Sequence, residues 1–213
     1  MIIAIDGTTA SGKGTLAKAI AQRYGLKRLD TGAIYRAVAL ALLDAGADPA
    51  DEGVATAAAA ALDLEAIDEE RIRSGAVGAA ASVVAAHPGV RAALLAAQRA
   101  FAAHPDGAVL DGRDIGTVVC PDADVKFFVV ADLAVRAERR WKELVARGEA
   151  PSLETVAADI AARDKRDAER PIAPTARAPG AYLLDTTALD AAATAAAACA
   201  IIDAALAGRA SQA

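Results

Sequence analysis

Short apolar runs alternate with long helical patterns along most of the chain. The apolar runs lie at residues 2–6, 27–29, 108–111, 125–130 and 182–185. Runs of this length and composition are typical of strands buried on both faces of a sheet, and helices between them are typical of parallel β-α-β units. The pattern predicts an α/β fold, with a five-stranded parallel sheet flanked by helices in three layers.

Helices are expected where apolar residues recur at helical spacing. They cover residues 13–24, 33–45, 51–61, 75–86, 90–103, 133–147, 152–168 and 189–207, and glycine or proline lies close to several of their ends. The stretch between the second and third predicted strands is almost wholly helical and much longer than a simple crossover needs. We therefore predict a helical subdomain inserted at the edge of the sheet.

Composition narrows the class of protein. The chain has 213 residues and a net charge of −5, from 23 Lys and Arg against 28 Asp and Glu. That length suits one domain, and the acidic balance argues against a nucleic acid polymer as partner. Hydrophobic residues make up 55% of the chain, but 62 residues are alanine, so we expect a small, helical core.

Three further features bear on the compartment. Cys120 and Cys199 have neither metal-site nor disulfide spacing, which fits a reducing cytosol. The first residues lack the basic start of a signal peptide. The most apolar later stretch, residues 191–202, has 12 residues and is too short to span a bilayer. We expect a cytoplasmic monomer with no membrane partner.

The strongest local signal follows the first predicted strand and precedes the first helix. It consists of Gly7, Thr8, Thr9, Ala10, Ser11, Gly12, Lys13, Gly14 and Thr15. In such a loop, small residues let backbone N–H groups surround phosphate oxygens, the helix adds its positive end, and Lys13 reaches the β- and γ-phosphates. The usual hydroxyl is displaced by one position because Gly14 precedes Thr15, which is the form seen in nucleoside monophosphate kinases.

Two other segments place charged residues at predicted element ends. Residues 30–36 are typical of a helix N-terminus with Thr31 as its cap, and Arg36 lies one turn later, where it can point at an anion. Residues 110–117 leave a buried strand with two carboxylates around Arg113. Because ligands of open α/β folds bind at the carboxyl ends of strands, these charges favour function over packing.

Arginine recurs at helical spacing in two later helices. The two stripes consist of Arg136, Arg139 and Arg140, and of Arg163, Arg166 and Arg170. Either stripe alone also fits a solvated, salt-bridged face. Together they bracket a predicted hinge at residues 148–151, and arginines that close over a transferring phosphoryl group stabilise its charge and exclude water.

In this order, the motifs resemble those of the bacterial cytidylate kinases, a family of P-loop nucleoside monophosphate kinases. The resemblance covers most of the chain and rests on residues 5–15, 30–36, 82–101, 111–123 and 163–170. It implies a three-layer P-loop NTPase fold with a helical nucleotide-binding insert and a short lid. We expect one kinase domain over residues 1–213, with a core (1–30, 105–131 and 171–213), a nucleotide-binding subdomain (about 31–104) and a lid (about 132–170).

The resemblance also implies a reaction and roles for single residues. ATP would be the phosphoryl donor with Mg²⁺, and CMP or dCMP the acceptor. Residues 7–15 would bind the ATP phosphates, Thr15 would help to hold Mg²⁺, and Lys13, Arg113, Arg139 and Arg140 would stabilise the transferring group. The acceptor would meet Arg36, Arg113 and Arg170 at its phosphate, Arg163 and Asp167 at its ribose, Ser82, Arg91 and Asp114 at its base, and the hydroxyl of Thr31. Cytosine presents an amino donor beside two acceptors, which suits a carboxylate or hydroxyl beside a guanidinium.

One segment departs from the family's pattern. Many cytidylate kinases carry a longer insert with a small antiparallel β element before the region of Ser82, whereas residues 62–75 are few and have no hairpin signal. We predict a trimmed, mainly helical insert.

Two other functions stay open on the sequence alone. A kinase of the same fold can act on AMP, UMP or a non-nucleotide acceptor. A P-loop switch or regulatory module without transfer chemistry is the alternative from another class. The chain contains no Asn, so it lacks the Asn-Lys-x-Asp motif that reads guanine in GTPases, and a mere binder does not need two arginine stripes.

Overall fold

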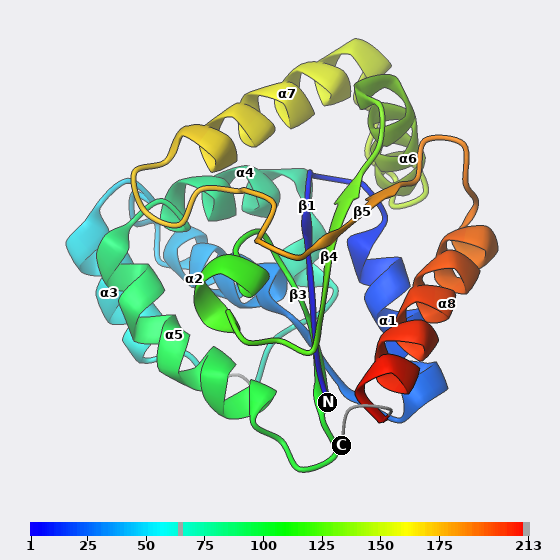
Figure 1. The fold of residues 1–213 in the computed structure, drawn as a ribbon. Helices are drawn as coiled ribbons and strands as arrows, with labels where there is room; N and C mark the ends of the chain where they lie inside the picture. The colour runs from blue at the N-terminus through cyan, green and yellow to red at the C-terminus, as the bar shows by residue number, and fades with distance from the viewer. Residues whose placement is uncertain (64–65, 211–213) are drawn as a thin grey trace.

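A five-stranded parallel sheet lies at the centre of the protein (Figure 1). The computed structural model describes residues 1–63 and 66–210, and of residues 209 and 210 it describes the backbone. The strand order is β2-β3-β1-β4-β5. The strands are β1 (Ile2–Gly7), β2 (Lys27–Asp30), β3 (Ala108–Asp111), β4 (Val125–Val130) and β5 (Tyr182–Asp185). The predicted α/β fold and all five predicted strands are confirmed.

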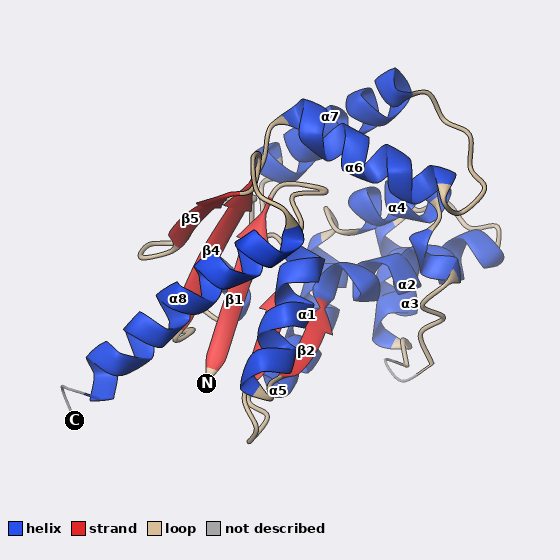
Figure 2. Cartoon of the chain, turned by 90° about the vertical axis from the view of Figure 1, so that its right-hand side faces the viewer, coloured by secondary structure: helices blue, strands red, loops and turns tan. Residues whose placement is uncertain are grey.

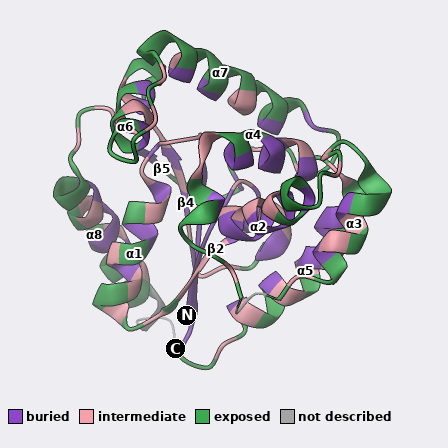
Figure 3. Cartoon of the chain, turned by 180° about the vertical axis from the view of Figure 1, so that it is seen from behind, coloured by how far each residue is buried: buried purple, intermediate pink, exposed green. Residues whose placement is uncertain are grey.

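The central strands β1 and β3 are buried on both faces, and alternate residues of each strand point to opposite sides of the sheet. In β1, Ile3 and Ile5 belong to a hydrophobic cluster with Phe127, whereas Ala4 packs with Leu110 on the other face. Figure 3 shows this burial along the strands and on the helix faces turned toward them. The continuous apolar strands of the sequence thus become the central layer.

Helices cover both faces of the sheet and extend beyond it (Figures 1 and 2). On one face lie α1 (Lys13–Tyr24) and α8 (Ala191–Ala210), and the other face packs against α5 (Pro88–Ala102) and the short η2 (Ile115–Val119). The insert contains α2 (Thr31–Asp44), α3 (Glu52–Ala60), η1 (Arg71–Arg73), α4 (Gly75–Val84) and α5. Above the sheet, α6 (Leu133–Val145) packs against α7 (Leu153–Glu169).

The insert has its own hydrophobic core. Ile34, Val38 and Leu42 of α2 pack with Val77 and Val84 of α4. Among the described residues of segment 62–75 there is a single 3₁₀ turn, η1, and no strand, as predicted. Residues 64 and 65 of that segment lie outside the described residues.

Two local predictions are wrong, and one short element was missed. The cap of α2 is Asp30, whose Oδ1 accepts from the Ala33 N–H at 2.9 Å, while Thr31 is the first helical residue. The short helix η2 was not predicted, because residues 115–119 have no amphipathic pattern long enough to detect. The helix α8 extends to Ala210, which overturns the argument that its apolar stretch is too short to span a membrane.

By length and composition, α8 meets the requirement for a membrane-crossing helix, since residues 191–208 have a mean hydropathy of 1.7. Alanine supplies most of this value. In the fold, Ala198 and Ile202 are fully buried against the sheet and α1. In this fold the helix therefore covers one face of the sheet.

Candidate active site

A large cavity opens at the carboxyl end of the central strand β1. Its volume is about 1060 Å³, and its walls come from the loop after β1, the ends of β2 and β3, the insert, α6 and the start of α8. β1 lies between β3 and β4. The chain continues from β1 to β2 toward one edge of the sheet, whereas it continues from β4 to β5 toward the other edge. Open α/β sheets bind ligands at such a point.

The loop after β1 has the backbone shape of a phosphate cradle. Gly7 has φ +142°, and a Cβ there would lie 1.9 Å from the carbonyl oxygen of Val129, so only glycine fits. Gly12 has φ +93° and caps α1 without a side chain. The first N–H groups of α1 therefore remain available to an anion.

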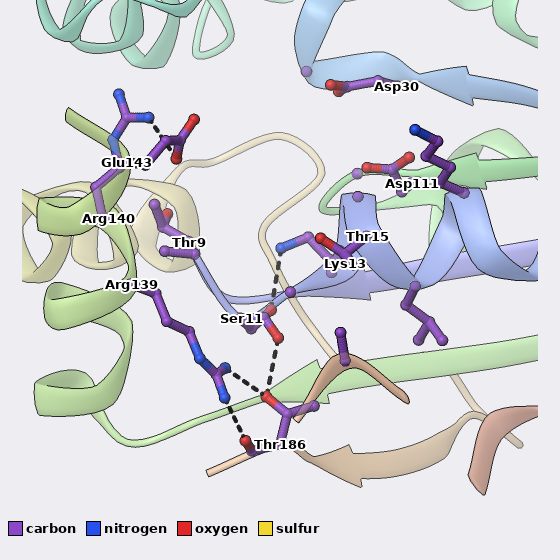
Figure 4. Close-up of a pocket in the computed structure, with 18 of the residues that line it drawn as sticks. Thr9, Ser11, Lys13, Thr15, Asp30, Asp111, Arg139, Arg140, Glu143 and Thr186 are labelled. Carbon is purple, nitrogen blue, oxygen red and sulfur yellow. Dashed lines mark hydrogen bonds and ion pairs between the residues drawn. The ribbon is translucent and has the colours of Figure 1, made fainter. Parts of the chain in front are cut away.

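Lys13 is buried at the floor of this cradle (Figure 4). Its Nζ donates to the carbonyl oxygen of Thr8 at 2.5 Å and to Ser11 Oγ at 3.4 Å. Burial, followed by the nearby positive charge of Arg113, lowers the pKa of Lys13 well below its usual value. An anionic ligand in the cavity would supply the negative charge that this ammonium lacks.

Two carboxylates face the same cavity, Asp111 from the segment around Arg113 that was predicted to be functional, and Asp30, which had no predicted role (Figure 4). Asp111, at the end of β3, has its pKa raised to about 6 by burial and by the charge of Asp30. Burial also opposes ionisation of Asp30, but Arg36 and the Ala33 N–H outweigh it and lower its pKa. The exposed side chain of Thr15 lines the same wall.

Arginines line the rest of the cavity. Arg139 donates to Thr186 Oγ1 at 3.0 Å and to the Thr186 carbonyl oxygen at 2.7 Å, and Arg140 pairs with Glu143 at 2.9 Å. Arg36 pairs with Asp30 at 2.8 Å. Each guanidinium is thus anchored by a neighbour while it contributes positive charge to the cavity wall.

At the insert end of the cavity, Arg113 connects the phosphate loop to α7. Its Nη2 donates to Thr9 Oγ1 at 3.0 Å, and its Nε donates to Asp167 Oδ2 at 2.9 Å. The same oxygen of Asp167 lies 3.9 Å from Arg163 Nε. Burial and the charge of Arg113 lower the pKa of Arg163 to about 10, so this end of the cavity also favours an anion.

A second charge cluster lies buried behind the cavity. Asp114 pairs with Arg91 through one oxygen and with Arg170 through the other, the latter at 3.3 Å. Arg91 also lies over the ring of Tyr35, 5.7 Å from its centroid. The two guanidiniums keep Asp114 in a polar environment, although burial raises its pKa.

The loop that holds Arg113 and Asp114 is fixed by Asp6. The carboxylate of Asp6 accepts the Ile115 and Gly116 N–H groups, both at 2.7 Å. Burial raises the pKa of Asp6 to about 6. A strand residue thereby orients the segment after the neighbouring strand.

Comparison with known proteins decides the family. The family model described as "Cytidylate kinase" matches residues 3–204. This chain belongs to the cytidylate kinase family. The resemblance inferred from its motifs is confirmed.

Cytidylate kinases of known sequence match the chain over nearly its whole length. The cytidylate kinase of Rhodopseudomonas palustris (strain BisB18) is 59% identical over 209 residues, which cover 98% of this chain and 99% of that protein. The cytidylate kinase of Nitrobacter winogradskyi is 59% identical over 203 residues, covering 95% and 96%. A crystal structure of an uncharacterized protein from Eubacterium ventriosum shares the fold, with a TM-score of 0.58 at 14% identity over 95% of this chain and 98% of that one.

Within this cytidylate kinase fold, the residues predicted from the sequence fall into two groups. One group lines the cavity: Thr9, Ala10, Ser11, Gly12, Lys13, Gly14, Thr15, Arg36, Arg113, Arg139, Arg140 and Arg163. The other group does not line it and comprises Gly7, Thr8, Thr31, Ser82, Arg91, Asp114, Asp167 and Arg170. Of these, Thr31 donates its hydroxyl proton to the Asp111 carbonyl oxygen at 2.8 Å, and Ser82 Oγ accepts from Arg166 at 3.2 Å.

Several residues of the cytidylate kinase site escaped sequence reasoning. Asp30 directly follows the predicted strand 27–29, which is a signal that could have drawn attention to it. Arg28 pairs with Asp111 at 3.3 Å from a strand at the sheet edge, and nothing in its local sequence marks it. Arg136 was placed in the same stripe as Arg139 and Arg140, but its side chain is buried and points to the phosphate loop.

Proposed function

We propose that this chain transfers the γ-phosphoryl group of ATP to CMP, and to dCMP, giving ADP and the corresponding diphosphate. The observation that carries the proposal is one cavity whose lining combines a phosphate cradle and Lys13 with Arg36, Arg113 and Arg163. A cavity with this many phosphate-binding groups suits transfer between two nucleotides. Membership of the cytidylate kinase family supports cytidine nucleotides as acceptors.

On the donor side, we assign residues 7–15 to the ATP phosphates. The backbone N–H groups at the start of α1 would bind phosphate oxygens, and Lys13 would leave Thr8 and Ser11 to reach the β- and γ-phosphates. Arg139 and Arg140 of α6 would approach the transferring group from the opposite wall. The rate gain comes from positioning and charge stabilisation, because the transferred group spreads its charge over three oxygens.

The acceptor needs no general base, because its phosphate is already an anionic nucleophile. Arg36, Arg113 and Arg170 would hold that phosphate, while Arg163 and Asp167 would bind the ribose. The phosphate oxygen attacks the γ-phosphorus as the bond to the β-phosphate oxygen breaks. The guanidiniums would offset the repulsion between the two phosphates.

Mg²⁺ fits the oxygen donors on the cavity wall. Thr15 supplies a hydroxyl and Asp111 a carboxylate, and Mg²⁺ prefers one or two such ligands together with phosphate oxygens and water. We assign Thr15 and Asp111 to hold it. When bound, the ion would neutralise charge on the donor phosphates.

The base would be recognised by Asp114, Arg91 and Ser82. The Asp114 carboxylate accepts hydrogen bonds, as the N4 amino group of cytosine requires, and the neighbouring guanidiniums donate, as its N3 and O2 require. In the structure these groups bind one another. Each oxygen of Asp114 accepts from one arginine and keeps a second lone pair, which the N4 amino group could use.

The three parts expected from the sequence all contribute to these roles. We propose residues 1–30, 105–131 and 171–213 as the core, about 31–104 as the nucleotide-binding part and about 132–170 as the lid. Arg140 and Arg147 of the lid region donate to the Arg73 carbonyl oxygen of the insert at 3.5 and 3.2 Å. Closure of these two parts would exclude water from the transfer.

An assay of ADP release with each nucleoside monophosphate in turn tests the proposal. We expect acceptor-dependent turnover with CMP and dCMP, and kcat/KM values for AMP and UMP at least about 100-fold lower. Faster turnover of AMP or UMP would assign the chain another acceptor. ATP binding without turnover on any acceptor would leave only a nucleotide-binding module.

A further inference from the structure

Every polar group of Thr9, near the tip of the phosphate loop, is bound by residues outside the loop. Its N–H donates to Asp164 Oδ1 of α7 at 2.9 Å, and its carbonyl oxygen accepts from Arg136 Nη1 of α6 at 3.1 Å. Its hydroxyl oxygen accepts from Arg113 Nη2 at 3.0 Å. The conformation of this residue is therefore set by the two lid helices and by Arg113.

The next residue, Ala10, is packed into the same helices. Ala10 lies against a small hydrophobic cluster of α6 and α7 that includes Ala137 and Ile160. Its φ of 59° is in the left-handed region, which a residue with a Cβ adopts only when its surroundings hold it there. The tip of the loop is thus held by polar contacts on one residue and by apolar packing on the next.

Asp164 and Arg136 connect these contacts to each other. Asp164 uses Oδ1 for the Thr9 N–H and Oδ2 for Arg136. The side chain of Arg136 is only 9% exposed, and its Nε also donates to the Ala131 carbonyl oxygen at 2.8 Å. The pair presents little net charge to the phosphates, because the carboxylate is neutralised by its own arginine.

We propose that Asp164 and Arg136 are positioning residues that hold the phosphate loop in the shape that binds the donor nucleotide. This inference rests on the proposed function of the loop as the ATP site. Loss of the Asp164 carboxylate would free the Thr9 N–H and leave the guanidinium of Arg136 without its ion-pair partner. The tip of the loop would then sample shapes in which its N–H groups no longer converge on phosphate oxygens.

The same helix separates this effect from acceptor binding. Arg163 and Asp167 of α7 interact with Arg113 and line or adjoin the insert end of the cavity. Asp164 instead faces the loop and α6. A change at Asp164 should therefore alter the affinity for ATP and leave that for CMP almost unchanged.

Calorimetric titration of Asp164→Ala with ATP alone and with CMP alone tests the proposal. We expect the Kd for ATP to rise about 10-fold or more and the Kd for CMP to change less than about 2-fold. Asp159→Ala is the matched control, because Asp159 is an exposed carboxylate on the same helix. It should leave both Kd values unchanged.

Asp164→Asn keeps the test valid if the alanine variant does not fold. Its amide oxygen can still accept from the Thr9 N–H, but it loses the charge that pairs with Arg136, so we expect about a 3-fold rise in the Kd for ATP. Unchanged ATP affinity, or an equal loss for both nucleotides, would overturn the positioning role. Failure of the unaltered chain to bind ATP or to phosphorylate CMP would instead overturn the proposed function on which it rests.

Discussion

Under the proposed function, the single positive charge of Lys13 stabilises the transferring group. Within the described part of the chain, its ammonium donates hydrogen bonds only to the Thr8 carbonyl oxygen and to Ser11 Oγ. Such contacts are easily exchanged for phosphate oxygens, because a charge-assisted bond to an anion is stronger than a bond to a neutral carbonyl.

Removal of this charge should affect turnover and leave the fold intact. We expect Lys13→Ala to lower kcat by about 10²- to 10³-fold in an ADP-release assay. Lys27→Ala removes an exposed lysine outside the cavity and should keep the full rate. A Lys13→Ala enzyme with unchanged circular dichroism and near-normal kcat would rule out the role assigned to Lys13.

Asp111 makes stability depend on pH in an unusual direction. Burial raises its pKa from 3.8 to about 6, so the folded protein keeps a proton that the unfolded chain has already released. Between these two values the folded state binds more protons, and its stability therefore falls as the pH rises.

Asp111→Asn removes that pH dependence. Because one pKa unit corresponds to about 1.4 kcal/mol, the variant should gain about 2 kcal/mol over the unaltered protein between pH 4.5 and pH 7.5. Urea denaturation at both pH values measures the difference. Asp6 has a similarly raised pKa but is present in both proteins, so its contribution cancels. A difference independent of pH would contradict the buried state of Asp111.

Sequence reasoning located the residues that lie within a recognisable motif. Lys13, Arg36 and Arg113 line the cavity as expected. It missed Asp164 and Asp6, because their roles depend on which loop packs against them. A carboxylate between basic residues in a helix, or at the end of a strand, looks the same in the sequence whether it faces solvent or a neighbouring backbone N–H.

The connection from β1 to α1 is the element on which the site depends most. A Cβ on Gly7 would collide with the Val129 carbonyl oxygen of the neighbouring strand, and its φ of +142° is unfavourable for any other residue. Gly208 in α8 differs, because nothing lies within 4 Å of a Cβ there. The two glycines therefore form a matched pair for substitution.

Gly7→Ala should lower the free energy of unfolding by about 2–5 kcal/mol through steric overlap and backbone strain. Gly208→Ala should raise it by about 0.5–1 kcal/mol, because alanine loses less backbone entropy in a helix. Urea denaturation of both variants provides the comparison. Equal stabilities for the two would show that the loop is not held as closely to β4 as the structure has it.

The elements themselves were largely predictable from periodicity. Strands β3, β4 and β5 begin and end where the apolar runs do. In β3 this follows from burial on both faces, which demands continuous apolar residues. The five-residue helix η2 and the end of α8 were not. The first is set by the Asp6 contacts with its backbone. The second runs past the predicted end through Gly208, and glycine usually marks the end of a helix and not its interior.

Across the whole molecule, an acidic protein gathers its arginines around one cavity. The net charge is −5, yet Arg36, Arg113, Arg139, Arg140 and Arg163 all contribute to the cavity wall. The phosphate loop, the insert and the lid region meet there although they are far apart in sequence. This convergence of positive charge on one cavity is the basis for proposing transfer between nucleotides.

The preference for cytosine over uracil tests the account most directly. The two bases differ where cytosine has an amino donor and uracil a carbonyl acceptor, so a carboxylate at position 114 should select the first. The measurement is the ratio of kcat/KM for CMP to that for UMP, in the unaltered enzyme and in Asp114→Asn.

We predict a ratio of at least about 100 for the unaltered enzyme, and at least about a 10-fold lower ratio for Asp114→Asn, whose amide N–H can donate to the uracil carbonyl. The KM for ATP should stay within about 2-fold, because Asp114 lies away from the phosphate loop. A ratio below 1 in the unaltered enzyme, or one that Asp114→Asn leaves unchanged, would contradict the account.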